Sequence, residues 1–302
     1  MLRRLSAALP AVFFLLACTL PRVPLDQHAP PAPSASLAAS SVPGPLTHHA
    51  AISAYWETTL SGVVNREHPD AAALEPHTVR IALPVHALTH PEHGTVYIDT
   101  GIPTGPIRGL ARLATGSMEP LQAMGQIIDQ HGQAAAIFLT HTHPDHLLGL
   151  PDVPVGTPVY VGPGEWEVRG QGRGALRRTF KTSLGAHTIT ELRFDGPRDG
   201  FAGVVDFWGD GSLLVLHTPG HTPGSISLLA RTTEGGMLFI GDTSHTLWGW
   251  DHGVEPGSFT LDHAQNARSL ARLRELADAH DLTVWVGHET DGEGTGITEL
   301  IH

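Results

Sequence analysis

The sequence predicts an α+β domain in which mixed β-sheets are covered by a few helices. Short apolar runs rich in β-branched residues recur along the chain, and Gly, Pro or Asp bounds most of them, which is typical of strands separated by turns. The 34 Gly and 24 Pro residues indicate many turns around short elements. Helical spacing occurs at 119–131 and, most clearly, at 262–280, where Leu270, Leu273 and Leu276 can share one face. Strands mixed with a few helices favour sheets that carry helices on their faces.

The first residues have the pattern of an export signal. Arg3 and Arg4 precede a short apolar run that ends in small residues, and this run is too short for a good membrane span. The stretch Leu15-Leu16-Ala17-Cys18 resembles the bacterial lipobox, which implies cleavage before Cys18 and lipid attachment to its sulfur. We therefore expect a lipoprotein signal peptide at 1–17 and an exported bacterial lipoprotein, in the outer membrane or facing the periplasm, that touches the membrane through Cys18 only. An uncleaved hydrophobic anchor, or a signal cut elsewhere, is the alternative.

The rest of the chain divides into a tether and one folded domain. Residues 18–47 are rich in Pro, Ala and Ser and lack a hydrophobic period, so we expect a tether there and the catalytic domain over 48–302. Because Cys18 is the only cysteine, intramolecular disulfides and thiolate metal ligands are excluded. Gly209-Asp210-Gly211 joins two of the predicted strands in the manner of a hairpin. The predicted strands are 78–88, 95–100, 135–140, 157–162, 203–208, 212–218, 225–230, 236–242 and 282–287.

The stretch HTHPDH, which begins at His141, has the pattern of a metal-binding loop. It directly follows a predicted strand, and alternate side chains of an extended chain point the same way, so His141 and His143 can converge. Pro144 favours an extended His143 and is well placed to begin a helical turn, which would direct Asp145 and His146 elsewhere. One loop can thus serve two adjacent centres. Imidazole and carboxylate ligands without thiolates suit zinc, and also iron or manganese.

Further candidate ligands lie at the ends of later predicted strands. They occur in HTPGHTPGS (217–225), FIGDTSH (239–245) and VWVGHE (284–289). Each stretch puts a His or Asp beside glycine just past an apolar run, where the backbone can turn tightly and side chains can meet at a sheet edge.

Taken in order, HTHPDH, PGHTPGS, GDTS and VGHE resemble the metallo-β-lactamase superfamily, and the resemblance extends from about residue 79 to 288. It implies a four-layer αββα sandwich. It also implies two Zn²⁺, with iron or manganese as possible substitutes, and every ligand position of the family is filled. The implied ligands are His141, His143 and His221 for one metal, Asp145, His146 and His288 for the other, and Asp242 bridging the two.

The resemblance implies a metal-dependent hydrolase. Two metals about 3.5–4 Å apart can share a water and hold it as a bridging hydroxide, which is expected to attack an ester-like carbonyl. Asp145 is expected to act as a ligand and as a possible proton shuttle. The stretches VVDFWGDGSLLVLHTPGHTPGSISLL and HPEHGTVYIDTG are similar to the N-acyl-homoserine lactonase branch, which opens a lactone ring by the same chemistry. The expected partner is therefore a small-molecule substrate, most simply a lactone, as in quorum quenching.

One position departs from the lactonase branch. Those lactonases often carry a tyrosine three residues after the bridging aspartate, where it contacts the substrate carbonyl, and this chain has His245 there. His245 can donate a comparable hydrogen bond as a catalytic residue, or it can pack at the rim of the site. Both interpretations stay open from the sequence.

Other functions fit the sequence less well. Metallo-β-lactamases are exported zinc enzymes, but they generally lack the bridging aspartate. A glyoxalase II-like thioesterase shares the ligands, but it has a C-terminal helical extension for which this chain leaves no room after His288. A periplasmic metal-binding lipoprotein is the non-enzymatic alternative. The formal net charge of −12 repels phosphate backbones, which argues against a nucleic-acid partner. The sequence leaves the oligomeric state open.

The other histidines are given an ordinary structural role. His217 lies in the PGHTPGS region but is expected to pack beside the site and not to bind metal. Exposure to solvent is the expectation for the histidines of tails, linkers and an apparent turn, namely His28, His48, His49, His68, His90, His93 and His302.

Overall fold

The computed structural model describes residue 37 and residues 42–107, 118–165 and 184–289. The predicted signal peptide, Cys18 and most of the predicted tether lie outside these residues, as do His28 and His302. Within the described ranges, no helix combines the length and the hydropathy that a membrane crossing requires.

One of two sheets is mixed and contains the long N-terminal strands. Its strands are β1 (Thr47–Thr59), β2 (Thr78–His90), β3 (Gly94–Ile98), β4 (Glu119–Pro120), β5 (Ala134–Phe138), β6 (Val159–Val161) and β7 (Ile189–Glu191). In the described part of the chain they run in the order β4-β1-β2-β3-β5-β6-β7. The β1, β2 and β3 strands pair antiparallel, whereas β3, β5, β6 and β7 are parallel. The parallel strands therefore end at the same edge.

The second sheet is built from the C-terminal half of the chain. Its strands are β8 (Gly203–Asp206), β9 (Leu213–His217), β10 (Ile226–Thr232), β11 (Gly235–Phe239) and β12 (Thr283–Trp285). Among the described residues their order is β12-β11-β10-β9-β8. The predicted hairpin is confirmed, because β8 and β9 pair antiparallel and the Asp206 carboxylate accepts the backbone N–H groups of Gly209 and Gly211.

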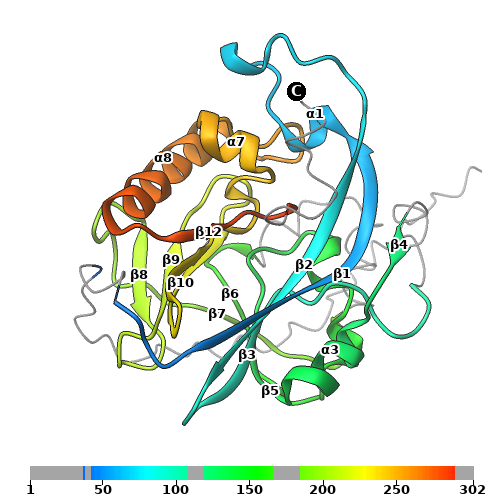
Figure 1. Cartoon of the computed structure of the whole chain (residues 1–302), viewed down its shortest axis with the longest axis vertical. Helices are drawn as coiled ribbons and strands as arrows, with labels where there is room; N and C mark the ends of the chain where they lie inside the picture. The colour runs from blue at the N-terminus through cyan, green and yellow to red at the C-terminus, as the bar shows by residue number, and fades with distance from the viewer. Residues whose placement is uncertain (1–36, 38–41, 108–117, 166–183, 290–302) are drawn as a thin grey trace, which may run out of the picture.

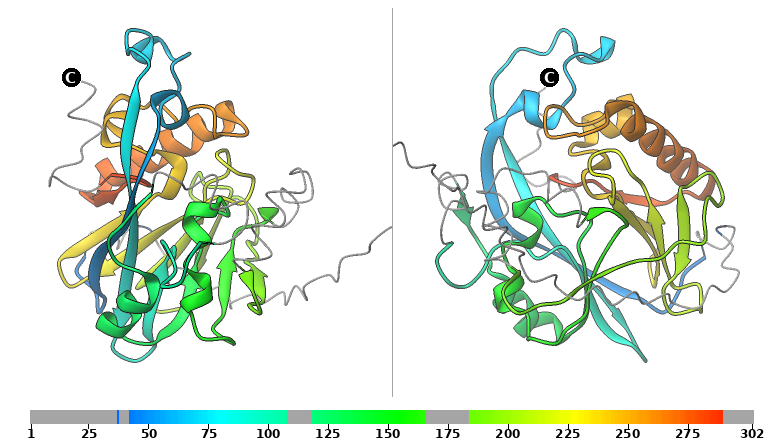
Figure 2. Two further views of the ribbon diagram at one scale, coloured as in Figure 1. Left: turned by 90° about the vertical axis from the view of Figure 1, so that its right-hand side faces the viewer. Right: turned by 180° about the vertical axis from the view of Figure 1, so that it is seen from behind.

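Alternation of side chains along the strands places helices on the outer faces of both sheets (Figure 1, Figure 2). In β9, Leu213 and Val215 face the other sheet, whereas Leu214 and Leu216 face α8 (His263–His280) through Leu273 and its neighbours. In β5 and β3 the opposite faces pack on α3 (Met124–His131). The result is the four-layer αββα arrangement. The shorter helices are α1 (Leu60–Val63), η2 (Pro69–Ala71), α4 (Pro144–Leu147), η3 (Leu150–Asp152), η4 (Gly241–Thr243) and α7 (Leu247–His252).

Two features differ from the sequence prediction. The helix expected over 119–131 begins only at Met124, because Pro120 belongs to the edge strand β4 and the Gln126 side chain accepts the Ala123 N–H to start the helix. The strands β1 and β7 have no apolar run to mark them. Most β1 side chains are half-buried or exposed, and pairing with β2 along the whole strand defines it.

The fold begins slightly before the expected domain. Gly44 N–H donates to the Thr232 carbonyl over 2.9 Å, and Leu46 is fully buried. The last residues of the predicted tether, 42–47, thus pair with the end of β10 and with β2.

Candidate metal centre

The HTHPDH loop adopts the conformation that its sequence predicts. It leaves the end of β5, and His143 is extended with φ −65° and ψ 151°. The imidazole rings of His141 and His143 converge, with centroids 4.5 Å apart. Pro144 begins α4, whose single turn carries Asp145 and His146 to the other side of the loop.

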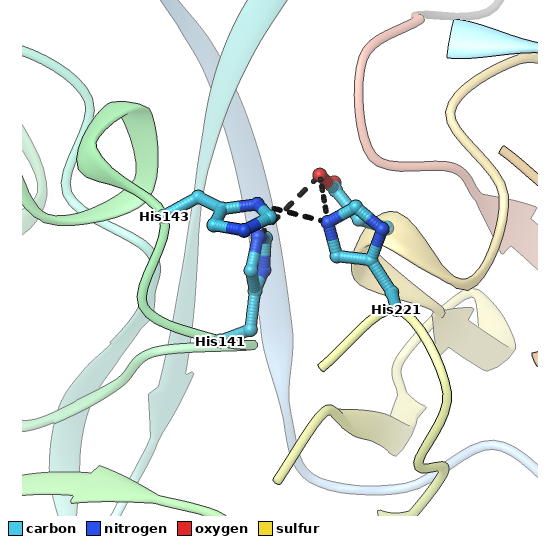
Figure 3. A group of neighbouring side chains, drawn as sticks. His141, His143 and His221 are labelled. Carbon is cyan, nitrogen blue, oxygen red and sulfur yellow. Dashed lines mark hydrogen bonds and ion pairs between the residues drawn. The ribbon is translucent and has the colours of Figure 1, made fainter. Parts of the chain in front are cut away.

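A first cluster consists of His141, His143, His221 and Asp242, whose candidate ligand atoms all lie within 4.8 Å of one another. Figure 3 shows the three imidazole rings pointing toward one another from two separate loops. His221 Nε2 lies 3.0 Å from His143 Nδ1 and 3.3 Å from Asp242 Oδ2. His141 Nε2 lies 3.5 Å from the same carboxylate oxygen.

A second cluster consists of Asp145, His146 and His288, and Asp242 joins it to the first. Asp145 Oδ2 lies 3.4 Å from Nε2 of both His146 and His288. Asp242 Oδ2 lies 3.4 Å from His146 Nε2 and 3.3 Å from His288 Nε2. One oxygen of Asp242 therefore faces nitrogens of both clusters, which is the arrangement of a bridging ligand.

Hydrogen bonds behind the rings orient the nitrogens that face inward. His146 Nδ1 lies 2.8 Å from the Asp99 carboxylate, and His288 Nδ1 lies 2.9 Å from the Ala82 carbonyl, so each Nδ1 carries the proton and donates it. Each Nε2 would then present a lone pair to a bound cation. His221 Nδ1 has Thr260 Oγ1 as its partner at 3.2 Å. These outer contacts fix ring orientation in the way that metal-binding histidines require.

The inward atoms fit divalent metal ions. Among the described residues, Nε2 of His141 and His146 and Oδ1 of Asp242 are buried without a hydrogen-bond partner, which is costly unless another group completes them. Ligands at about 2.0–2.1 Å around a tetrahedral zinc lie roughly 3.3 Å from one another. The separations of 3.0–3.5 Å within the two clusters match this spacing.

The electrostatics of the two clusters differ. Burial, together with the neighbouring His146, holds the pKa of His141 well below its ordinary value, and burial also lowers the pKa values of His143 and His221. Burial opposes protonation of His146 and His288 as well, but the Asp242 carboxylate raises the pKa of both rings above the ordinary value. Burial acts to raise the pKa of Asp242, yet the field of His288, His245 and the other rings holds it well below its usual range. The carboxylate is thus anionic and ready to bind a cation.

A model of the metallo-beta-lactamase superfamily matches residues 87–288 of this chain. The chain belongs to the metallo-β-lactamase superfamily. Membership confirms the resemblance seen in the sequence and the expected class, a metal-dependent hydrolase.

Relatives within the superfamily include lactonases. The N-acyl homoserine lactonase AttM of Rhizobium radiobacter is 29% identical over 234 residues, which are 70% of this chain and 83% of the lactonase. A quorum-quenching N-acyl homoserine lactone lactonase of known structure superposes with a TM-score of 0.64 at 20% identity and covers 84% of this chain and 95% of that one. An N-acyl homoserine lactone hydrolase with N-hexanoyl-L-homoserine at its catalytic metal centre gives a TM-score of 0.61 at 22% identity, covering 80% of this chain and 92% of that one. These superpositions confirm the expected sandwich fold.

In this protein the His245 side chain is buried between the two clusters, next to Asp242. His245 is 2% exposed, and its Nε2 lies 2.9 Å from Asp242 Oδ2. Its ring packs against His221 and His288, one from each cluster, with centroids 5.2 and 4.9 Å away. Unlike the rings of His146 and His288, it has no outer hydrogen bond, since its Nδ1 is buried without a partner among the described residues. His245 is therefore buried beside the proposed bridging aspartate, and its catalytic role stays a prediction.

Sequence reasoning missed several residues that hold the ligands in place. Asp99 follows β3 with a left-handed backbone, φ 59°, and accepts the Thr140 backbone N–H as well as contacting His146. Asn266 of α8 accepts the His221 N–H with Oδ1 and donates to the Thr243 carbonyl with Nδ2. The polar residue directly after the apolar run of β3 is a signal that could have identified Asp99. Asn266 lies on the buried face of a helix and carries no such signal.

Among the histidines predicted to be exposed, His48 and His90 are covered by aromatic side chains. His48 is half-buried, with Nε2 3.1 Å from His86 Nδ1, and its ring packs on Phe239 and Trp285. His90 is 5% exposed. In both cases the pairing of β2 with its neighbours carries the ring under aromatic side chains, which no local pattern indicates.

His90, His93 and Asp210 also have candidate ligand atoms within 4.8 Å of one another. However, His90 Nδ1 accepts the backbone N–H groups of Glu92 and His93, so its proton lies on Nε2 and is donated to Asp210 over 3.1 Å. A ring satisfied in this way has no free lone pair for a metal. His217 has the expected packing role, since it bonds the Pro223 carbonyl and stacks on Phe194.

Proposed function

We propose that the protein is a di-zinc hydrolase that opens the ring of a small lactone, with N-acyl homoserine lactones as the substrate class. The observation that carries the proposal is the shared oxygen of Asp242 between two clusters of buried histidines and carboxylates. The lactonase relatives, which match over more than two thirds of the chain, supply the substrate class. The ligands are proposed to be His141, His143 and His221 for one ion, Asp145, His146 and His288 for the other, and Asp242 for both.

The chain's residues bind and orient what the reaction needs. Bound at these residues, two ions would lower the pKa of a water so that it can act as the nucleophile, and would polarise the ester carbonyl. In the net reaction the water oxygen bonds to the carbonyl carbon, the ring C–O bond breaks, and a proton passes to the released alkoxide. Asp145 is the proposed carrier of that proton, because its buried carboxylate lies within the second cluster and its other contacts are two imidazoles.

His245 is proposed to act on the substrate and not as a metal ligand. The ligand rings of His146 and His288 are locked by an outer hydrogen bond, whereas His245 Nδ1 is free of any described partner. Its Nε2–H group can donate to Asp242 in the resting site and turn to a substrate carbonyl on binding. This is the role that a tyrosine has in related lactonases.

A substrate panel tests the proposed function. Purified zinc-loaded protein is incubated with N-acyl homoserine lactones, a thioester and a β-lactam, with and without a chelator. Chelator-sensitive ring opening of the lactones is expected. Preferential turnover of the thioester or the β-lactam would replace lactonase by one of those activities. Two bound metals with no turnover of any substrate would favour a metal-binding lipoprotein.

We also propose that the mature protein is a lipoprotein held to a membrane through Cys18 and the Pro-, Ala- and Ser-rich residues that follow it. The lipobox-like sequence supports this proposal. Fractionation of cells that express the full chain tests it. The protein is expected in the membrane fraction, and Cys18→Ser is expected to release it or to leave the precursor uncleaved. Equal distribution together with equal cleavage of both proteins would contradict lipidation.

A further inference from the structure

A buried carboxylate outside the two clusters joins two of the loops that carry ligands. Glu165 lies just beyond β6 and is fully buried. Its Oε2 accepts the hydroxyl of Thr142, the residue between His141 and His143. Its Oε1 accepts the hydroxyl of Thr222, the residue after His221, and the backbone N–H of Gly224 at 3.0 Å. All three donors belong to the loops of the first cluster.

The backbone around Glu165 is shaped so that the carboxylate can reach both loops. A Cβ atom at Gly224 would lie 2.5 Å from Glu165 Cγ, and one at Gly162 would lie 2.0 Å from the Gly224 carbonyl oxygen. Both glycines thus permit a close approach between the end of β6 and the His221 loop. The Gly164 backbone is left-handed, with φ 86°, and turns the chain between β6 and Glu165.

Among the described residues, no Lys or Arg side chain forms an ion pair with Glu165. Its hydrogen-bond partners there are two hydroxyls and one amide, which are neutral. Burying a carboxylate is costly unless hydrogen bonds or a cation compensate it. Glu165 thus places a second carboxylate beside the loops of the first cluster, in which Asp242 is the sole carboxylate.

We propose that Glu165 is a positioning residue of the first cluster, which holds the His141–His143 loop and the His221 loop in register and adds negative charge beside them. The inference rests on the proposed di-metal function and deepens it. It assigns to Glu165 a part in binding one of the two ions and no contact with substrate. The second cluster is held by other groups, chiefly Asp99 and the Ala82 carbonyl.

Three variants separate charge from geometry. Glu165→Gln keeps the size of the side chain and removes its charge. Glu165→Asp keeps the charge but is one methylene too short to reach both loops. The double variant Thr142→Val and Thr222→Val leaves Glu165 in place and removes the two hydroxyl donors. Asp206→Asn is the matched control, because Asp206 is also a buried carboxylate that accepts backbone N–H groups, but it pairs with Leu214 at the other end of β9 from the His221 loop.

The measurement is metal binding, with zinc titrated against a chromophoric chelator and with the absorption spectrum of the cobalt-substituted protein. Glu165→Gln is expected to weaken one of the two binding steps by about 10–100-fold, as outer residues of metal sites do. The other step should change much less. Glu165→Asp should fall between Glu165→Gln and the wild type, and the double threonine variant should weaken the same step. Asp206→Asn should bind both ions as the wild type does, with the wild-type cobalt spectrum.

Several results would overturn the inference. Unchanged affinity and an unchanged cobalt spectrum in Glu165→Gln would do so, as would equal weakening of both steps. If Glu165→Gln does not fold, the threonine double variant decides the question. Wild-type metal binding by that variant would reject the positioning role of Glu165. Failure of the proposed function can be distinguished from failure of this inference. A wild-type protein that binds two ions but turns over no substrate would not be the proposed hydrolase. Metal binding by the Glu165 variants would still test the positioning role of Glu165.

Discussion

His245 Nε2 lies 2.9 Å from Asp242 Oδ2, the same oxygen that faces nitrogens of both metal clusters. Asp242 is the proposed bridging ligand, and His245 stands where related lactonases often have a tyrosine. A change at His245 can therefore act on the substrate or on the metals, and the two effects can be separated.

His245→Phe is expected to lower kcat/KM for a lactone by about 100-fold, the usual loss when one hydrogen-bond donor to a reacting carbonyl is removed. Zinc content should stay at the wild-type level, because the ring lacks the outer hydrogen bond of the ligand histidines. His245→Tyr should recover much of the activity. Steady-state kinetics and elemental analysis on the same samples check both points. Loss of one zinc in His245→Phe would make His245 a ligand instead.

His221→Ala is expected to lose metal and activity together. His221 is fully buried, faces His143 and Asp242, and is oriented by Thr260 behind it. Removing it leaves the first cluster with one fewer nitrogen and a cavity between its loops. His93→Ala is the matched control, since His93 belongs to a group of potential ligands away from the two clusters, in which His90 has no free lone pair. Zinc content and lactone turnover should be normal in the control. Full activity in His221→Ala would refute the assignment.

Metal binding by the second cluster is expected to release protons and to weaken as the pH falls. Asp242 raises the pKa values of His146 and His288, so in the metal-free protein these rings hold protons at a pH where free histidine does not. A cation must displace those protons, so its apparent affinity falls as the pH falls through the raised values. The first cluster has lowered pKa values and should depend less on pH. Calorimetric titration in buffers of different ionisation enthalpy measures the protons released; zero release in the second step would contradict this prediction.

The metal-free protein is expected to lose stability as the pH falls from about 6.5 to about 4. Burial, and then the neighbouring His49, lowers the pKa of His48 from 6.5 to about 4, and burial also holds the pKa of His86 well below its ordinary value. The unfolded chain therefore takes up protons at a higher pH than the folded one, so the free energy of unfolding decreases as the pH drops through this range. Urea unfolding at several pH values measures it. His48→Leu should flatten the dependence, and an identical slope in this variant would assign the acid sensitivity to other groups.

The sequence predicts the strands that are marked by apolar runs, such as β5 and β11, because buried strands must be apolar on both faces. It also predicts the residues of HTHPDH and of the later strand ends that come together in space. It does not predict β1, whose side chains are largely exposed and whose extended shape depends on pairing with β2. Position along the chain gives no sign that Asn266, Glu165 or Thr260 lies beside the His221 loop. Those contacts arise when α8 and β6 pack against it, which is a property of the tertiary fold.

For His245 the sequence predicts the position near the site but not the orientation of the side chain. Its spacing from Asp242 places it near the site, but its orientation depends on η4 and on the packing of His221 and His288 around it. The side chain points inward because Asp242, His221 and His288 surround it. These residues are brought together by the tertiary fold, so no local sequence pattern predicts the orientation of His245.

Gly44 and Leu46 of the N-terminal segment pair with Thr232, the end of β10 that is opposite to Ile226, and the Ile226 N–H donates to the Thr140 carbonyl beside His141. Seven residues of extended strand span roughly 20 Å. The contact of the N-terminal segment with Thr232 thus lies about one strand length from the loop that carries His141 and His143, so this part of the segment does not cover the metal ligands.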